Sequence, residues 1–123
     1  MLDISDAAEI GDLWEKIESK AALPTTPEEF FGKSGLKPLE EHRAFVRHYL
    51  RCQGILRRDS ETHAVYMKDC SRTGMGLVSP VQIFPRERIQ LWMNPQRSYS
   101  LEITRCRRIS ANCYECGTIF ILK

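Results

Sequence analysis

Several features of membrane and secreted proteins are missing from this 123-residue sequence. No apolar run approaches the roughly 20 residues that a membrane-spanning helix needs, and Met1-Leu2-Asp3 does not begin a secretory signal. The five cysteines are an odd number and are not spaced as the framework of a small disulfide-rich domain. We therefore expect a cytoplasmic protein that does not insert into a membrane.

Catalytic patterns are missing as well. None of the three histidines belongs to a recognisable catalytic motif, and no nucleophile, base and orienting group occur together. Internal repeats and low-complexity segments are also absent. The sequence therefore gives no indication of an enzyme, and we expect no resident cofactor.

Charge is distributed unevenly along the chain. Residues 1–41 hold four Lys/Arg against ten Asp/Glu, whereas residues 42–123 hold fourteen against six, which gives the net charge of +2. Positive charge concentrated in one part of a small domain favours an anionic partner.

The N-terminal third differs from the rest of the chain. Apolar residues at helical spacing predict an amphipathic helix over residues 5–21, capped by Ser5: Ile10, Leu13, Trp14, Ile17 and Ala21. This apolar stripe would pack on the protein's own barrel, on a second copy or on another protein. Residues 23–38 form a linker rich in proline and glycine, with one helical turn from Thr26 and with Phe30 and Phe31 as anchors to the core.

From Tyr49 onward the pattern is that of strands. We predict strands at 49–57, 62–68, 75–79, 88–93, 98–109 and 113–122. The turns between them fall at 58–60, 69–74, 94–95 and 111–112. Six short strands joined mostly by tight turns predict a mainly β fold, a small six-stranded antiparallel barrel at 42–123 behind an N-terminal helical extension and linker at 1–41.

Two motifs carry candidate binding groups. Arg43 and Arg47 form an R-x-x-x-R, which places two guanidinium groups on one side of an extended or helical segment. The segment 69–74 follows with Asp69, Ser71 and Gly74 in a turn that offers a carboxylate, a hydroxyl and a close backbone approach. Gly74 and Gly76 would also allow a positive φ.

Together these motifs resemble the PilZ domain, the bacterial family that binds cyclic di-GMP. The first matches the family's R-x-x-x-R before the first barrel strand, and the second matches its [D/N]-x-S-x-x-G. Residues 117–121 resemble the family's last strand, and the resemblance covers roughly residues 40–123. A second R-x-x-x-R, Arg47 and Arg51, leaves the register of the arginine pair open.

The resemblance implies a receptor for cyclic di-GMP, and the chemistry of the residues fits this ligand. A guanidinium group can bond guanine O6 and N7 together, pair with a phosphate or stack on a base. Asp69 can accept from the N–H groups on the Watson–Crick edge of guanine, an edge on which adenine presents a different pattern. Further candidates for ligand contact are His42, Arg51, Arg72 and Arg107, the last on the penultimate strand together with Arg105 and Arg108. The family suggests motility, biofilm formation or secretion as the process, with a protein partner reached through the N-terminal helix or a barrel face.

Three other interpretations stay open. Some PilZ-like proteins serve as pilus-assembly adaptors without nucleotide. Cys113 and Cys116 form a C-x-x-C that could bind zinc with His42, His48 or His63, although residues three apart on a strand face opposite sides. A small barrel with basic and aromatic residues could also bind single-stranded nucleic acid, but its aromatics read mostly as core. The sequence also leaves open whether the chain forms a homodimer and whether it binds one nucleotide or two.

Overall fold

Strand β5 (Arg88–Met93) shows how the sequence builds the sheet. Ile89, Leu91 and Met93 are buried, and they alternate with the exposed Arg88 and Gln90. Successive side chains on a strand point to opposite faces, so this pattern turns one face toward an apolar core and the other toward water.

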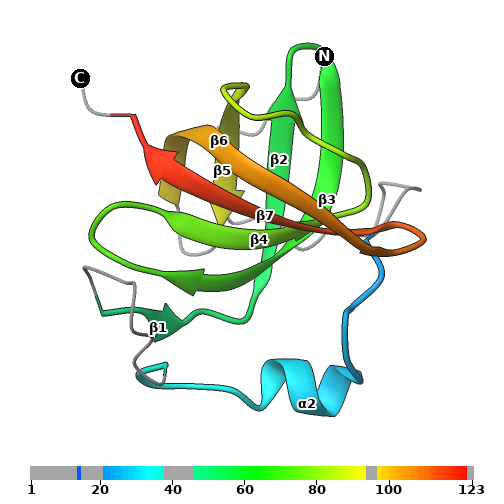
Figure 1. Ribbon diagram of the computed structural model, residues 1–123, viewed down its shortest axis with the longest axis vertical. Coiled ribbons are helices and arrows are strands. Elements are labelled where there is room, and N and C mark those ends of the chain that lie inside the picture. Colours follow the sequence, from blue (N-terminus) through cyan, green and yellow to red (C-terminus); the bar gives the residue numbers. More distant parts are fainter. Residues whose placement is uncertain (1–13, 15–20, 38–45, 94–96, 122–123) are drawn as a thin grey trace.

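The computed structural model describes residues 14, 21–37, 46–93 and 97–121. The other strands are β1 (His48–Tyr49), β2 (Gln53–Arg58), β3 (Glu61–Cys70), β4 (Met75–Ser79), β6 (Arg97–Ser110) and β7 (Cys113–Phe120). They are antiparallel in the order β1-β3-β2-β5-β6-β7-β4, and an additional β3–β4 pairing closes β2 to β7 into a barrel (Figure 1). The predicted mainly β, six-stranded antiparallel barrel is therefore confirmed, with β1 as one extra strand that pairs with the end of β3 on the side opposite β4.

Two predicted boundaries were wrong. The single strand predicted at 49–57 is interrupted at residues 50–52, so that β1 and β2 are separate pieces that both pair with β3. Asp69 and Cys70, predicted as part of a turn, are the last residues of β3, and the turn itself covers residues 71–74. The predicted turns at 58–60 and 111–112 are present, with Asp59 and Asn112 at positive φ. The predicted turn at 94–95 lies outside the described residues.

The barrel interior is filled by apolar side chains from β2 to β7. Its buried members are Leu56, Val65, Met67, Met75, Leu77, Ile83, Ile89, Leu91, Met93, Leu101, Ile103 and Cys116. Most of the aromatic residues that were expected in the core pack against this cluster or against a smaller one formed by Trp14, Ile55 and Ala64: Tyr66, Trp92, Tyr99, Tyr114 and Phe120. Phe84 is an exception, because it follows β4 in a loop where its ring is exposed beneath the guanidinium of Arg58.

β-Bulges on β3 and β6 change the direction of side chains. The register shifts between Met67 and Asp69 on β3, and again between Ile103 and Arg105 on β6. An extra residue in one strand breaks the alternation, so the residues after it point to the opposite face from the one that simple counting gives. Ile103 is therefore inside the barrel while Arg105 is exposed.

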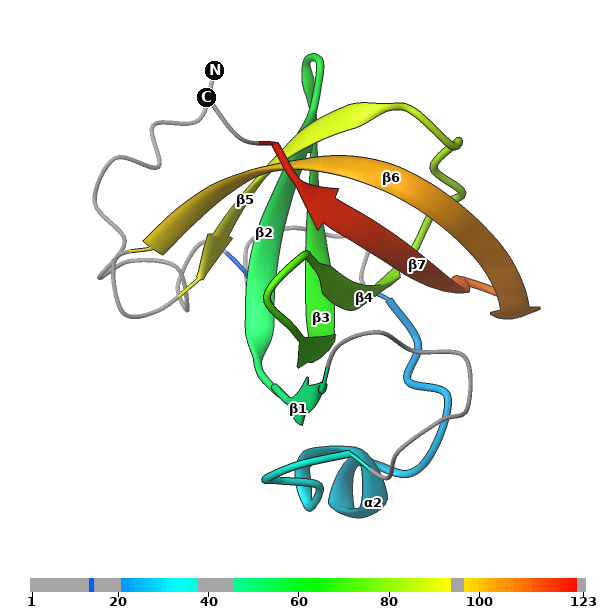
Figure 2. The same cartoon turned by 60° about the vertical axis from the view of Figure 1, so that its left-hand side comes forward.

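Helix α2 (Pro27–Phe31) lies with β1 at one end of the barrel (Figures 1 and 2). Thr26 caps the helix by accepting a hydrogen bond from the Glu29 N–H, and proline occupies the first turn, as the sequence predicted. Phe30 is fully buried, whereas Phe31 is 42% exposed, so only the first of the two predicted anchors is in the core. None of the helices among the described residues has the length and apolar character needed to cross a membrane.

Trp14 is the described part of the predicted N-terminal helix, which otherwise lies outside the described residues up to Ala21. Trp14 is buried against Ile55, Ala64 and Tyr66 on the outer face of β2 and β3, and its indole N–H donates to the Val65 carbonyl at 3.3 Å. This part of the apolar stripe therefore packs on the protein's own barrel.

Candidate functional site

A cavity of about 160 Å³ lies where the bulged ends of β3 and β6 meet β4 and β7. Its lining contains four cationic side chains and two carboxylates: Arg47, Lys68, Arg105 and Arg107 with Asp69 and Glu115, beside Gly76, Cys116 and Gly117. The excess of positive charge favours an anionic ligand.

The bulge on β3 makes Asp69 part of this cavity. Lys68 and Asp69 are consecutive, yet both line the same cavity, which an unbroken strand would not allow. A Cβ at the facing residue Gly76 would lie only 2.7 Å from Asp69 Oδ1. The carboxylate therefore fits because a glycine stands opposite it.

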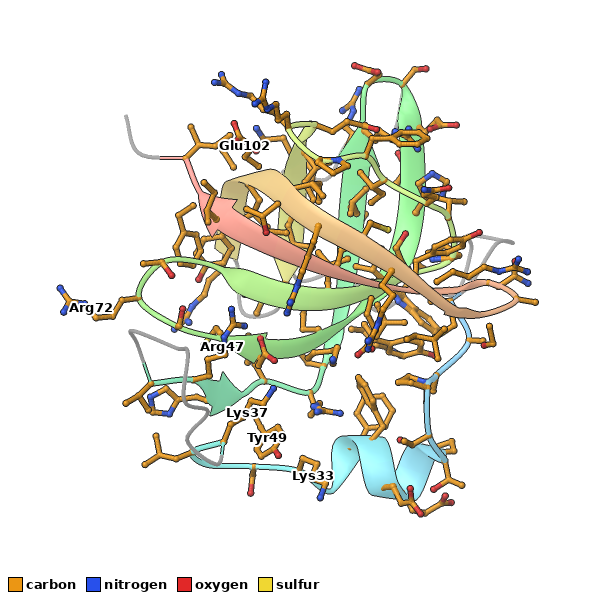
Figure 3. All side chains as sticks on the ribbon, in the orientation of Figure 1. Lys33, Lys37, Arg47, Tyr49, Arg72 and Glu102 are labelled. Atoms are coloured by element: carbon orange, nitrogen blue, oxygen red, sulfur yellow. The ribbon has the colours of Figure 1, made fainter. Side chains whose placement is uncertain are left out.

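Two cations bind Asp69 from the segments before the barrel. Arg47 Nη1 donates to Oδ1 at 2.5 Å, and Lys37 Nζ donates to Oδ2 at 2.9 Å (Figure 3). Burial by itself would raise the pKa of Asp69, but the hydrogen bond from Lys37 and the charges of Lys37, Arg47 and Lys68 outweigh it and lower that pKa below its ordinary value. Asp69 is thus an ionised, almost fully buried acceptor.

Glu115 on β7 organises a second group of charges. It accepts hydrogen bonds from Lys68 and, at 3.0 Å, from Arg107. Burial would raise the pKa of Glu115, but these two hydrogen bonds and charges lower it overall. Arg105 differs from these cations, because it has no ion pair within the described part of the chain and its side chain lies across Gly117, with Nε 3.1 Å from where a Cβ would be. Arg105 is therefore the cation of the cavity that is available to a ligand without breaking such a pair.

The turn at residues 71–74 is tight and closely packed on β7. The Ser71 N–H donates to the Gly74 carbonyl at 2.9 Å, and Ser71 Oγ accepts from the Thr73 N–H at 3.3 Å. A Cβ on Gly74 would lie 1.8 Å from the Thr118 carbonyl oxygen. Of the described glycines only Gly35 has a positive φ, so the glycine at position 74 is explained by this close approach and not by its φ.

Apart from Arg51, the remaining predicted site residues fall into three groups. Arg43 and His42 lie outside the described residues. Arg72 projects outward from the turn between β3 and β4 and does not line the cavity (Figure 3). Arg107 lines the cavity and is paired with Glu115.

Arg51 has a different environment from Arg47. Its guanidinium lies 4.3 Å from the centre of the Phe30 ring and 5.0 Å from that of Tyr49, and its Nε donates to the Lys68 carbonyl at 2.9 Å. It does not line the cavity. Arg51 therefore ties α2 and β1 to β3, and of the two arginines only Arg47 reaches Asp69.

The cysteines of the C-x-x-C pack in different places. Cys113 is buried with Ala21, Phe30 and Val78, while Cys116 lies in the barrel core with its Sγ 3.3 Å from that of Cys106. In the described part of the chain, no three His, Cys, Asp or Glu side chains are grouped as metal ligands.

Several residues that line the cavity or contact Asp69 were missed or not singled out from the sequence. Lys37 lies in the linker, Lys68 and Glu115 were assigned no role, and Arg105 was named only as one of three arginines on its strand. The one available signal was the position of Lys68 directly before the Asp69 motif. Arg105 gave no such signal, because strict alternation puts it on the face of Ile103 and only the bulge turns it outward.

Comparison with known proteins agrees with the motifs. The family model described as the PilZ domain matches residues 41–121. A search of curated proteins found no match. The family match extends from just before Arg43 through the last barrel strand, and so contains both motifs and the entire barrel. The chain therefore belongs to the PilZ domain family.

Proposed function

We propose that this chain is a cytoplasmic bacterial receptor for cyclic di-GMP that passes the signal to a partner protein. PilZ domains in general bind cyclic di-GMP and act as binding or adaptor domains. The ligand-binding residues in this proposal are Arg43, Arg47, Asp69, Ser71 and Gly74. Arg107, already a candidate from the sequence, is included because it lines the cavity, and Arg105 is added for the same reason.

The observation that supports this proposal best is the contact between Arg47 and Asp69. It joins the second arginine of one motif to the carboxylate of the other, 22 residues away in the sequence, inside a cavity with an excess of cations. If the two motifs were only surface charge and a self-capped turn, nothing would require them to share a cavity.

The roles of the residues follow from their chemistry. The ionised Asp69 can accept from the two N–H groups on the Watson–Crick edge of guanine, which adenine cannot supply. Arg47 and Arg43 provide guanidinium groups for a phosphate or for guanine O6 and N7, and Arg105 provides a flat cation that can stack on a base. The cavity volume of about 160 Å³ is below the ~300 Å³ or more of sites that enclose drug-sized ligands, so most of the dinucleotide would lie outside the cavity.

Calorimetric titration tests the proposal. Wild-type protein should bind cyclic di-GMP saturably and should not bind cyclic di-AMP, and the stoichiometry would decide between one nucleotide and two. Arg47→Ala and Asp69→Asn should each weaken binding by at least tenfold, since each removes a charged hydrogen-bonding group. Arg88→Ala is the matched control, because Arg88 is an exposed arginine on β5 that does not line the cavity. Well-folded wild-type protein that binds no cyclic di-GMP would refute the proposal and favour the nucleotide-independent adaptor.

Transmission to a partner would use the contacts that run from the cavity to the N-terminal segment. Tyr66 contacts the rings of Trp14 and Phe30, at 5.3 and 5.9 Å between centres, and Phe30 lies under Arg51, which donates to the carbonyl of the cavity residue Lys68. A ligand that binds one arrangement of the segment before β1 more tightly would therefore shift the packing under Trp14 as well. Motility, biofilm formation or secretion would be the process controlled. Pull-downs that recover the same partners in equal amounts with and without cyclic di-GMP would contradict this part of the proposal.

A further inference from the structure

Both oxygens of the Asp69 carboxylate are occupied in the structure. Oδ1 accepts from Arg47 and Oδ2 accepts from Lys37, and the Asp69 side chain is only 4% exposed. A guanine that pairs through its Watson–Crick edge needs both oxygens side by side. It can therefore reach Asp69 only if these cations give way.

The two cations differ in what they can do next. Arg47 lines the cavity, so it can turn from Asp69 to a phosphate or base of the ligand without leaving the site. Lys37 is absent from the cavity lining and reaches Asp69 from the linker, with its Nζ 5.8 Å from the centre of the Tyr49 ring (Figure 3). Release of Oδ2 therefore depends on Lys37.

The backbone holds Lys37 in this position. Its N–H donates to the Arg47 carbonyl at 2.9 Å, and the Tyr49 N–H donates to the Gly35 carbonyl at 2.8 Å, so residues 35–37 are attached to the segment that leads through Arg47 into β1. The lysine stem is long and flexible, which lets the ammonium group leave the carboxylate while these backbone bonds remain. Competition at Asp69 thus requires a movement of one side chain.

We propose that Lys37 is an internal competitor of the guanine base for Asp69, and that it lowers the affinity of the protein for cyclic di-GMP. This inference rests on the proposed function and adds a residue outside both motifs that sets how much ligand is needed. If Lys37 instead stayed in place and added its charge to ligand binding, its removal would weaken the binding of cyclic di-GMP.

The test compares Lys37→Met with Lys33→Met. Both variants remove one positive charge from the same linker, and Lys33 is exposed and has no ion pair with the described residues. The general loss of attraction for an anionic ligand is therefore similar in the two variants. The competitor makes a charged hydrogen bond, so its removal should leave Lys37→Met with about tenfold tighter binding of cyclic di-GMP than Lys33→Met.

Calorimetric titration of wild type and both variants separates the outcomes. Tighter binding of cyclic di-GMP by Lys37→Met than by Lys33→Met, or binding by Lys37→Met alone, supports the inference. If wild type binds cyclic di-GMP and Lys37→Met binds it no more tightly than Lys33→Met does, the inference is overturned and the proposed function stays intact. Failure of all three folded proteins to bind refutes the proposed function and this inference with it. If Lys37→Met does not fold, Lys37→Gln makes the same comparison with a polar side chain.

Discussion

Replacement of Gly74 by alanine should destabilise the protein even in the absence of ligand. The three heavy atoms nearest to a Cβ at this position are all backbone atoms of β7, the closest being the Thr118 carbonyl oxygen at 1.8 Å. Cβ contacts shorter than 3.0 Å essentially do not occur, so the turn and β7 would have to separate by about 1.2 Å, the difference between 3.0 and 1.8 Å. A backbone cannot yield locally as the end of a flexible side chain can.

The cost follows from the hydrogen bonds that such a separation would break. The Phe120 N–H donates to the Thr73 carbonyl at 2.8 Å, and the buried Thr118 hydroxyl donates to the Met75 carbonyl at 2.8 Å and accepts from the Met75 N–H at 3.2 Å. Lengthening by about 1.2 Å takes all three beyond bonding distance. At a net value of about 1 kcal/mol each, Gly74→Ala should lower the free energy of unfolding by about 3 kcal/mol. For a domain of this size, the melting temperature should fall by about 10 °C.

Urea unfolding followed by tryptophan fluorescence and by circular dichroism measures this loss. Ser71→Ala is the control in the same turn, because it removes a hydroxyl whose bonds stay within the turn, and it should cost less than about 1 kcal/mol. A loss for Gly74→Ala no larger than that of Ser71→Ala would refute the reasoning from the close approach. It would also favour the other explanation of Gly74, that a glycine is needed there to let the ligand approach the turn.

Three further predictions concern charge and burial. Because the pKa of Asp69 is lowered in the folded protein, its carboxylate stabilises the fold above the ordinary pKa, and this contribution is lost as the pH falls toward the lowered value. Urea unfolding from about pH 6 to about pH 3 should therefore show a steeper loss of stability for wild type than for Asp69→Asn, and parallel curves would contradict the ion pairs. Arg51→Ala should lower the free energy of unfolding without ligand by about 2 kcal/mol. Arg51→Lys should lose less than Arg51→Ala but still be less stable than wild type, because a lysine cannot stack a planar group on Phe30. Wild-type stability of Arg51→Lys would count against stacking. Burial raises the pKa of the Cys116 thiol, so iodoacetamide should leave Cys116 unmodified in native protein and label it after unfolding, as read by peptide mass mapping.

Most of the barrel could be predicted because its strands alternate cleanly. In β5, buried residues alternate with exposed or half-buried ones, and the turns at 58–60 and 111–112 carry Asp59 and Asn112, residues that tolerate a positive φ. The strand predicted at 49–57 was wrong in its middle, because its pattern gave no sign that residues 50–52 leave the regular sheet. There the side chain of Arg51 turns to α2, and such a tertiary contact has no signal in local sequence.

The candidate site was predicted mainly where it coincides with motifs, with Arg107 on the penultimate strand as the exception. Arg47 and Asp69 could be named from the sequence because two known patterns contain them, and the structure brings them into contact. Lys37 and Arg105 could not be singled out, since one lies in a linker and the other depends on a bulge. A bulge is set by the fit between neighbouring strands, and the residues of one strand alone do not reveal it.

The charges around Asp69 explain how a buried acceptor is maintained before any ligand arrives. Burial by itself would favour the protonated form of Asp69. A protonated carboxyl group carries an O–H donor, whereas the N–H groups of a guanine edge need acceptors. The cations Arg47 and Lys37 keep the carboxylate ionised, so the acceptor is ready, but each occupies one of its oxygens. A ligand must therefore replace these contacts with its own N–H groups and also provide an anion to receive a displaced cation. A guanine joined to a phosphate does both, whereas a free neutral base brings no anion for the displaced Arg47. Binding by guanine alone should accordingly be far weaker than binding by guanine nucleotides, and equal binding of the two would show that exchange of the cations does not limit access to Asp69.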